Sequence, residues 1–456
     1  MESDIRYYST NRSVPPVGLG DALLMGQAAD RGLFLPERLP AFAAAELRDL
    51  VGRTYPEVAF AVLRRFAGGM LPELRLREIC ADAYDYEVPL ERVTDRRWLL
   101  RLDRGPTASF KDFAARMMAR WMGGLMEQVQ GDLVILTATS GDTGSAVAHA
   151  YHGVPRVHSV VLFPRAEVSD RQRRQMTTLG GNVRTFAVDG KFDDCQAMVK
   201  QAFADPDLRH IRLSSANSIN IGRLLPQAVY YVWAYVRVAD VAAGEPIVFS
   251  IPSGNFGDMM GAVLAWRLGV PMSRLVIATN ANDEVPRFLA TGTYGKIVPS
   301  RDCISNAMNV GHPSNLARLV DLYGGWMDET GVVREPPDFA RMNRDLFAVS
   351  IPDDETRATI RAAWDRHGVV LEPHGAVGWA GLERYLAAHP DQAGALAVSV
   401  ETAHPAKFPD EIRALLGLEP AAPPALAGLD ARPEQYGHLT TDYAPFRDLL
   451  QQTYGS

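Results

Sequence analysis

The chain has 456 residues, about three times the typical domain length of ~150 residues, so two or three domains are expected. Hydrophobic residues make up 47% of the chain and charged residues 22%, which excludes large-scale disorder and fibrous proteins. The net charge of −7 disfavours a nucleic-acid-binding protein.

The chain has three cysteines, Cys80, Cys195 and Cys303, and no two of them form a C-x-x-C pair. They fit neither a disulfide framework nor a zinc site, and they favour a reducing compartment. The first 13 residues are polar, and no segment reaches the ~18 apolar residues that a membrane helix needs. We therefore expect a soluble, cytoplasmic protein that binds no membrane.

Residues 1–90 are predicted to be mostly helical, with an amphipathic helix at 56–66. From about residue 96 the pattern alternates between strands and helices. The predicted strands are 98–102, 133–139, 159–163, 183–188, 247–251, 275–279 and 395–400, and the predicted helices are 109–125, 146–151, 170–179 and 259–268. Strands separated by helix-length segments indicate an α/β fold with at least two sheets.

Two segments depart from this alternation. Residues 300–350 are less regular and are expected to form an insertion. Residues 420–433 are rich in proline and alanine, which predicts a linker to a short C-terminal segment.

Four predicted strands end in loops of small and polar residues, at 140–145, 253–258, 280–283 and 401–404. Ligands bind beyond the carboxyl ends of strands in open α/β sheets, so the four loops predict one shared site. Turn chemistry alone would also produce such loops. Two of them open helices with glycine-rich turns that suit a phosphate group. Neither fits the dinucleotide fingerprint or the P-loop.

Lysine is scarce, because only five of the 47 basic residues are lysines. Lys111 lies in the run GPTASFKDF, where Ser109 and Asp112 resemble a capping box that would place it in the first turn of a helix. The helix dipole and the flanking Phe110 and Phe113 would disfavour the ammonium form. An uncharged lysine amine reacts with carbonyl groups. The alternative is a solvent-exposed lysine near a helix start.

The histidines do not indicate a metal site. His149, His152 and His158 lie close together, but no H-E-x-x-H motif or cysteine pair accompanies them. The G-x-S-x-G turn of serine hydrolases is also absent. We expect no metal.

The run GPTASFKDFAARMM resembles the cofactor-lysine motif of threonine synthases, a family of pyridoxal-phosphate (PLP) enzymes with the tryptophan-synthase-β-like fold (fold type II). Further segments resemble the family in the same order: YYSTNR near the N-terminus, TATSGDTGSAVAHA, GKFDDCQAMVKQAF, SSANSINIGRLLPQ, IPSGNFGDMMG, ATNANDEVPRFL, EPHGAV and TAHPAKF. The resemblance therefore spans nearly the whole chain.

The resemblance implies two parallel or mixed sheets with the cofactor in the cleft between domains. It implies an N-terminal, mostly helical domain at 1–95 and a PLP-binding core at 96–419, followed by the linker and C-terminal segment at 420–456. Within the core, a smaller domain would cover about 111–220, and a larger one about 96–110 and 221–419.

The resemblance also implies roles for individual residues. Lys111 would hold PLP, Asp142 would face the ring hydroxyl of PLP, and Thr402 would face the ring nitrogen, which a neutral hydroxyl would leave largely unprotonated. The loop that would bind the cofactor phosphate consists of Ser253, Gly254, Asn255, Phe256 and Gly257. The residues that would bind a substrate phosphate are Thr143, Asn217, Ser218 and Arg223. An ordinary surface cation is the alternative for Arg223.

The implied reaction converts the small molecule O-phospho-L-homoserine and water to L-threonine and phosphate. Two alternatives are a phospho-lyase of the same fold that releases 2-oxobutyrate and a catalytically silent PLP-binding regulatory protein. The chain departs from the family pattern at four positions: Arg31 replaces the usual Gly, Arg104 the usual His, Ser109 the usual Ala, and Gly375 a larger residue. The sequence does not give the oligomeric state.

Overall fold

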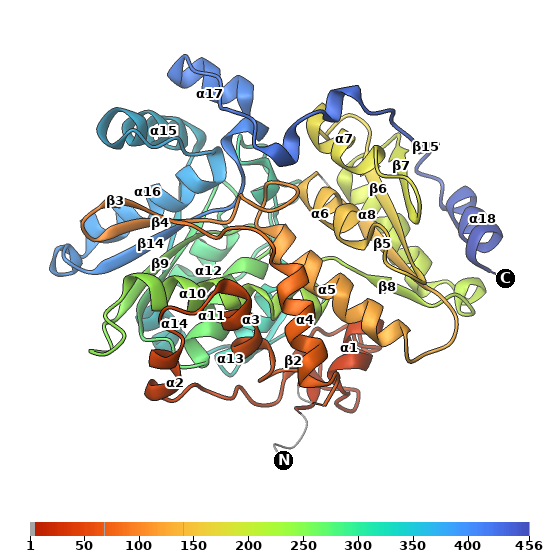
Figure 1. The fold of residues 1–456 in the computed structure, drawn as a ribbon, viewed down its shortest axis with the longest axis horizontal. Helices are drawn as coiled ribbons and strands as arrows, with labels where there is room; N and C mark the ends of the chain where they lie inside the picture. The colour runs from red at the N-terminus through yellow and green to blue at the C-terminus, as the bar shows by residue number, and fades with distance from the viewer. Residues whose placement is uncertain (1–4, 68, 140, 456) are drawn as a thin grey trace.

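The protein is described by a computed structural model that covers residues 5–67, 69–139 and 141–455. Two separate sheets form its framework, one of six strands and one of five, and helices cover both faces of each (Figure 1). This confirms the predicted α/β architecture with two parallel or mixed sheets.

The larger sheet has the strand order β13-β10-β9-β14-β4-β3. Its first five strands are parallel, and β3 runs antiparallel to β4 at the edge. The bounds are β13 (Leu346–Ser350), β10 (Met272–Thr279), β9 (Ile247–Pro252), β14 (Leu396–Glu401), β4 (Arg97–Arg101) and β3 (Leu90–Thr94). Four of these strands lie within three residues of their predicted bounds.

Helices α16 (Pro373–Ala388) and α15 (Asp353–His367) lie on one side of this sheet, and α10 (Gln227–Val238) and α11 (Gly257–Arg267) on the other (Figure 1). Successive side chains of a strand point to opposite faces. Along β9, Val248 packs with residues of α16, whereas Phe249 and Ile251 enter the central core. Burial on both faces explains why these strands are continuous apolar runs.

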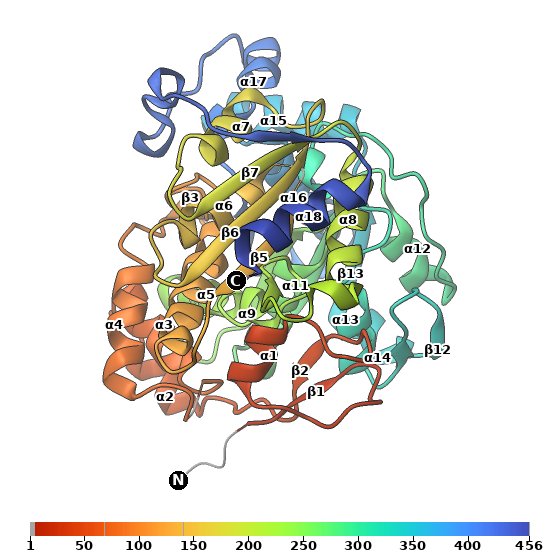
Figure 2. The ribbon, with the colours of Figure 1, turned by 90° about the vertical axis from the view of Figure 1, so that its right-hand side faces the viewer.

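The smaller sheet is entirely parallel, with the order β15-β7-β6-β5-β8. Helices α6 (Asp142–Tyr151) and α7 (Asp170–Thr177) pack on one face, and α8 (Phe192–Ala204) and α18 (Tyr443–Tyr454) on the other (Figure 2). The strands are β15 (Gly437–Leu439), β7 (Val183–Val188), β6 (Val157–Pro164), β5 (Leu133–Ala138) and β8 (Leu213–Ser215). The C-terminal segment thus completes this sheet.

In its described part, the N-terminal region contains four helices and a short antiparallel strand pair, and loops make up much of the rest, so it is less helical than expected. The helices are α1 (Leu19–Met25), α2 (Ala44–Asp49), α3 (Tyr55–Leu63) and α4 (Glu73–Ala83), and the strands are β1 (Tyr7–Ser9) and β2 (Phe34–Pro36). Helices α3 and α4 pack on α10 and on α5 (Lys111–Met126), respectively. The helices of this region thereby join the large central core.

The segment 300–350 is less regular than the rest, but its last five residues form the edge strand β13. The sequence analysis missed this strand, although its first four residues, Leu346 to Val349, form a short apolar run. The remaining elements are α9 (Ile221–Leu224), α12 (Glu284–Thr291), α13 (Leu316–Leu322), β11 (Trp326–Met327), β12 (Val333–Glu335), α14 (Phe339–Asp345) and α17 (Pro409–Leu416). Among the described residues, no helix combines the length and hydrophobicity needed to cross a membrane.

Candidate active site

Lys111 is the first residue of helix α5, as predicted, but the capping box that led to this prediction does not form. The Ser109 hydroxyl has no hydrogen-bond partner. The Asp112 carboxylate instead accepts hydrogen bonds from the backbone N–H (2.8 Å) and the hydroxyl (2.6 Å) of Thr107. Asp112 thus reaches past the helix start and holds the loop that precedes Lys111.

That loop is also fixed to the end of β14. The Phe110 N–H donates to the Thr402 carbonyl at 2.8 Å, and Ser109 forms a bridge with Ala403. Ala108 has a φ of 55°, in the left-handed region that non-glycine residues seldom adopt. Strained backbone of this kind persists where the surrounding contacts over-determine it, which often happens at functional sites.

The Lys111 side chain is partly accessible, and its Nζ lies 5.2 Å from the centroid of the Phe110 ring. Burial of this amine lowers its pKa below the ordinary value, and the nearby Lys407 and Arg223 lower it further, against the opposite effect of Asp142. Within the described residues, Nζ has no ion-pair or hydrogen-bond partner. The direction agrees with the sequence prediction that this site disfavours the ammonium form of Lys111.

Asp142, the first residue of α6, forms a buried ion pair that the sequence did not predict. Its Oδ1 lies 2.6 Å from Lys407 Nζ and accepts a hydrogen bond from Gln172 Nε2 at 2.9 Å. Burial alone would raise the pKa of Asp142, but the two lysines Lys407 and Lys111 and the Gln172 bond hold it below its usual range. The preceding Ser140 lies outside the described residues, and Thr143 follows Asp142 in the same helical turn.

The scarcity of lysine, which pointed to a functional role for Lys111, points equally to a role for Lys407. Lys191, Lys200 and Lys296 are exposed, whereas the Lys407 side chain is 1% exposed. Lys407 is already paired with a carboxylate, so Lys111 is the lysine whose amine is free to react.

Arg223 is a buried cation without an acidic partner in the described part of the chain. The residue is 3% exposed, and burial lowers its pKa to about 10. One terminal nitrogen donates to the Ala216 carbonyl at 2.5 Å, while Nε has no partner. A guanidinium left unpaired in the interior is costly, so this arrangement indicates that an anion completes the site.

Two other predicted substrate residues, Asn217 and Ser218, lie in the segment that leads into the helix of Arg223. Asn217 donates to the Ala138 carbonyl at the end of β5 (3.2 Å), and its buried Oδ1 has no partner. A side chain built on Gly257 would come within 3.5 Å of the Ser218 Cβ. The 217–223 segment therefore connects the end of β5 with the loop that follows β9.

The loop 253–257 has the geometry of an anion-binding turn. Phe256 has a left-handed φ of 62°, and α11 begins at the next residue, so the first N–H groups of an 11-residue helix face the loop. Gly254 packs so closely on residues 307–308 that a Cβ there would lie 3.0 Å from the Met308 Cα. Asn255 Oδ1 accepts from the Ser314 N–H (3.3 Å), and Ser253 Oγ donates to the Ile251 carbonyl (3.0 Å).

These residues fit PLP. The cofactor needs an uncharged lysine amine for its aldehyde and a cradle of N–H groups for its phosphate, and the site offers Lys111 and the 253–257 loop. Asp258, in the first turn of α11, is electrostatically coupled to Lys111, which places the cradle near the amine. The Tyr231 hydroxyl donates to Asp258 Oδ1 at 2.7 Å, and Tyr230 donates to the same atom.

Thr402 lies beside a group of buried carboxylates. Its hydroxyl donates to Glu372 Oε1 at 3.3 Å, and Glu372 also caps α16 by accepting from the N–H groups of His374 and Gly375 (2.8 Å each). Burial raises the pKa of Glu401 well above its usual range, and Arg101, 3.6 Å away, only partly offsets this effect.

Asp103 belongs to the same group. Both of its carboxylate oxygens lack hydrogen bonds, although Arg104 Nε lies 3.5 Å from Oδ1. The Arg104 side chain is 46% exposed. Arg104 therefore covers this buried acid from the solvent side.

The side chains of the predicted loop at 280–283 form hydrogen bonds with the segment 301–309 rather than with the other three loops. Asn280 donates to the Ser305 hydroxyl (3.2 Å), and Asn282 donates to the Arg301 carbonyl (3.0 Å). These residues hold the 301–309 segment, which in turn packs against Gly254. The 280–283 loop therefore contacts the predicted phosphate loop indirectly, through the 301–309 segment, and a direct role for it in the site stays a prediction.

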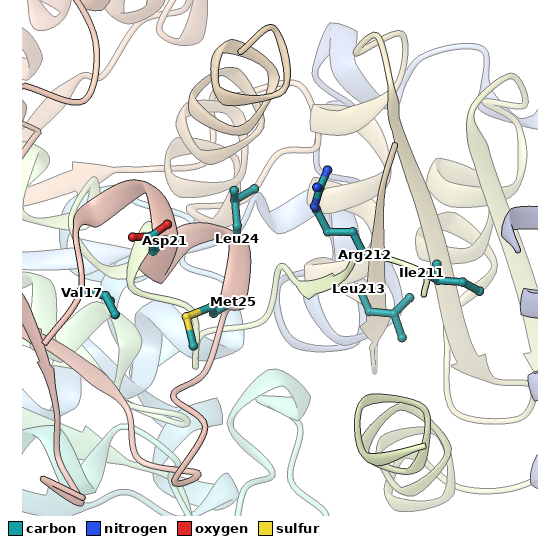
Figure 3. A pocket seen from close by; sticks show the side chains of 7 residues that line it. All are labelled: Val17, Asp21, Leu24, Met25, Ile211, Arg212 and Leu213. Carbon is teal, nitrogen blue, oxygen red and sulfur yellow. The ribbon is translucent and has the colours of Figure 1, made fainter. Parts of the chain in front are cut away.

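A separate pocket of about 430 Å³ lies between α1 and β8 (Figure 3). Its lining is apolar apart from Asp21 and Arg212 and includes none of the strand-end residues described above. It is therefore distinct from the Lys111 site. Across the described residues, no group of three or more His, Cys, Asp or Glu side chains is arranged to hold a metal ion.

The sequence matches three family profiles. The profile described as pyridoxal-phosphate dependent enzyme covers residues 88–400, threonine synthase N terminus covers 6–84, and threonine synthase, C-terminal covers 375–449. Together they account for almost the whole chain.

Characterised proteins of similar sequence carry the same name. Threonine synthase from Serratia marcescens is 38% identical over 93% of this chain and 94% of its own length. The threonine synthase from Escherichia coli strain K12 is 36% identical over 98% of this chain and 99% of its own length.

Solved structures agree with these matches. PLP-bound threonine synthase from Brucella melitensis superposes with a TM-score of 0.91 at 35% identity, over 99% of this chain and 100% of that chain. Threonine synthase from Escherichia coli gives a TM-score of 0.87 at 36% identity, over 98% of this chain and 99% of that chain.

Proposed function

Because the chain belongs to the threonine synthase family of PLP-dependent enzymes, we propose that it converts O-phospho-L-homoserine and water to L-threonine and phosphate. The observation that carries this proposal is that two basic side chains, Lys111 with a lowered pKa and Arg223 without an acidic partner in the described structure, act on one site. Lys111 offers an uncharged amine, and Arg223 offers a guanidinium that no carboxylate neutralises in the described structure. A substrate that bears both an amino group and a phosphate matches that pair.

The residues that would hold the cofactor are Lys111, through a covalent bond from Nζ, and the loop Ser253, Gly254, Asn255, Phe256 and Gly257, through its phosphate. Asp142 and Thr402 would face the cofactor ring, in keeping with their places beside Lys111 and Phe110. When bound, PLP delocalises the negative charge that develops at the substrate Cα.

Lys111 would act as the general base. Once the substrate amine displaces its Nζ, the uncharged amine would take the proton from Cα, pass it on to the bound cofactor, and then, uncharged again, take one from Cβ. The burial that lowers its pKa keeps it able to accept these protons near neutral pH. Lys111 is thus assigned two roles, as the cofactor anchor and as the base.

Arg223, with Asn217, Ser218 and Thr143, would bind the substrate phosphate. A buried arginine forms charge-assisted hydrogen bonds to phosphate oxygens, and these bonds strengthen as negative charge accumulates on the phosphate leaving Cγ. Water then adds at Cβ, and the protons taken earlier return to Cγ and Cα to complete L-threonine.

We also propose the division of the chain at about residues 95 and 419 and a cytoplasmic location. The first boundary is supported by the adjacent profile matches, which end at 84 and resume at 88. The second lies near the proline-rich linker. The free state of Cys80, Cys195 and Cys303 is consistent with a reducing compartment.

Product analysis tests the reaction. The purified protein, supplied with PLP and O-phospho-L-homoserine, should release threonine and phosphate in equal amounts. Phosphate accompanied by 2-oxobutyrate and little threonine would assign the protein to the phospho-lyase alternative. No turnover, with PLP bound at Lys111, would favour the catalytically silent alternative. A Lys111→Ala variant serves as the blank for both products.

A further inference from the structure

Lys407 joins three parts of the site: the turn after β14, the start of α6 and the loop before Lys111. It lies in the turn after β14 of the larger sheet, and its Nζ pairs with Asp142, at the start of α6 over the smaller sheet (2.6 Å). Nζ also donates to the Thr107 carbonyl at 3.1 Å, in the loop that leads into Lys111. The two charged side chains are 1% and 4% exposed, so water screens them little.

The charges around Lys111 come from five different elements. Asp142 (α6) and Glu372 (before α16) favour the ammonium form, whereas Lys407 (after β14) and Arg223 (α9) oppose it. Asp258 (α11) is a further carboxylate that interacts electrostatically with Lys111, and its Oδ1 accepts hydrogen bonds from the hydroxyls of Tyr230 and Tyr231. Asp142 is the acid that acts most strongly on Lys111, and Lys407 already holds it.

One carboxylate can neutralise one ammonium group. Asp142 has the short contact with Lys407, and Lys111 is left without a counter-ion among the described residues. If Lys407 carried no charge, Asp142 would be a buried, unpaired anion beside the only other lysine in the site. Its most favourable partner would then be a protonated Lys111.

We propose that Lys407 is a positioning residue of this active site: by pairing with Asp142, it leaves Lys111 uncharged and available as nucleophile and base. Lys407 forms no bond to the substrate in this scheme and acts through Asp142. The inference rests on the proposed function, because it assigns the reaction to Lys111.

Competitive acetylation measures the ionisation of each lysine directly. The full-length chain, freed of PLP and checked by circular dichroism against the holoenzyme, is treated with trace acetic anhydride at a series of pH values. Peptide mass spectrometry then gives the acetylation rate of each lysine. Because the chain has only five lysines, the exposed Lys296 provides an internal reference in every sample.

In the wild-type protein, the Lys111 rate should reach half its maximum at a lower pH than the Lys296 rate. Lys407→Met should raise the Lys111 midpoint by at least one unit, which slows its acetylation about tenfold at a pH below both midpoints. The Lys296 profile should not change. An unchanged Lys111 midpoint in Lys407→Met would overturn the proposal.

The double variant Asp142→Asn/Lys407→Met removes both charges and keeps the side-chain sizes similar. It should bring the Lys111 midpoint from the Lys407→Met value back to the wild-type value or below it, because Asp142 acts on Lys111 more strongly than Lys407 does. If Lys407→Met does not fold, the double variant and Asp142→Asn still decide the matter, since Asp142→Asn alone should lower the midpoint. A raised midpoint in either variant would also overturn the proposal.

The proposed function fails in a different way. Borohydride reduction of the wild-type holoenzyme should leave a pyridoxyl group on Lys111, and a group found on Lys407 would disprove the assignment of Lys111. The acetylation profiles of the PLP-free chain are independent of that result.

Discussion

Gly375, in the first turn of α16, lies directly against the carboxylate of Glu401 at the end of β14. A methyl group at position 375 would overlap Glu401 Oε2, which is itself buried without a hydrogen-bond partner. The departure from the family pattern at 375 is thus explained by the acid that fills the space, because a larger residue and Glu401 cannot both occupy these positions.

Gly375→Ala should lower the free energy of unfolding by about 1–3 kcal/mol, the usual cost of overpacking a core. In a Glu401→Ala background the same change should be neutral or stabilising by about 0.5–1 kcal/mol, because alanine restricts the unfolded chain. Urea denaturation of the four proteins gives the coupling energy. Equal effects of Gly375→Ala in both backgrounds would refute the steric explanation. Gly394→Ala, in open space, is the control and should be within ±0.5 kcal/mol.

Arg223→Ala tests the assignment of the substrate phosphate. The loss of a charge-assisted hydrogen bond costs about 1.5–3 kcal/mol, so kcat/KM for O-phospho-L-homoserine should fall ~10- to ~100-fold. Much of the loss should appear in kcat, because the interaction strengthens as the phosphate leaves. PLP content and the cofactor absorption spectrum should not change.

The control for Arg223→Ala is Arg209→Ala, which removes an exposed arginine from the same region of the chain. Its kinetics should match those of the wild type. Loss of PLP from Arg223→Ala, with normal kinetics in the remaining holoenzyme, would mean that Arg223 binds the cofactor phosphate and that the two phosphate sites were assigned the wrong way round.

Glu284 should make stability depend on pH. Burial raises its pKa from 4.5 to about 7 in the folded protein, so the folded state keeps the proton that the unfolded chain releases near pH 4.5. The folded state therefore loses stability as the pH rises from about 4.5 to 7. Glu284→Gln should be more stable than the wild type by up to about 2 kcal/mol at pH 8 and equal to it at pH 4.

Thermal or urea unfolding at the two pH values measures this difference. The exposed Glu335→Gln is the matched control and should show no pH-dependent gain. A Glu284→Gln variant that is no more stable at pH 8 than at pH 4, relative to the wild type, would show that Glu284 ionises normally in the folded protein.

Arg31, where the family usually has glycine, is another departure whose effect can be tested. Its φ of 67° lies in the left-handed region, where glycine avoids a cost of roughly 1–2 kcal/mol. Arg31→Gly should therefore stabilise the protein by about 0.5–1 kcal/mol after the larger entropy of the unfolded glycine chain is subtracted. Arg31→Ala removes the same side chain but keeps Cβ, and denaturant unfolding should show no gain for it.

The sequence predicted those features that depend on local patterns. The strand at 133–139 and the helix that begins near Lys111 were found because apolar periodicity and turn residues lie in one short segment. The capping box failed because the helix begins at Lys111, with Phe110 rather than Ser109 at its N-cap, and because the Asp112 carboxylate accepts its hydrogen bonds from Thr107. A pattern of residue types cannot distinguish these partners.

The Lys407–Asp142 pair could not be predicted, since its members belong to loops of different sheets that only the tertiary fold brings together. The same holds for the Glu401 carboxylate under Gly375, and for β15, whose three residues carry no strand signal of their own. Resemblance to a family supplied the residues of the cofactor and substrate sites, but not the contacts by which this chain holds them.

Both sheets take strands from distant parts of the chain: β4 pairs with β14, and β15 pairs with β7. A ribosome synthesises residues 97–101 long before residues 396–401, and residues 183–188 long before residues 437–439. While the chain is growing, the partner edges of β4 and β7 stay open, and open strand edges promote aggregation. The growing chain therefore exposes both edges to other chains until about 440 residues have left the ribosome.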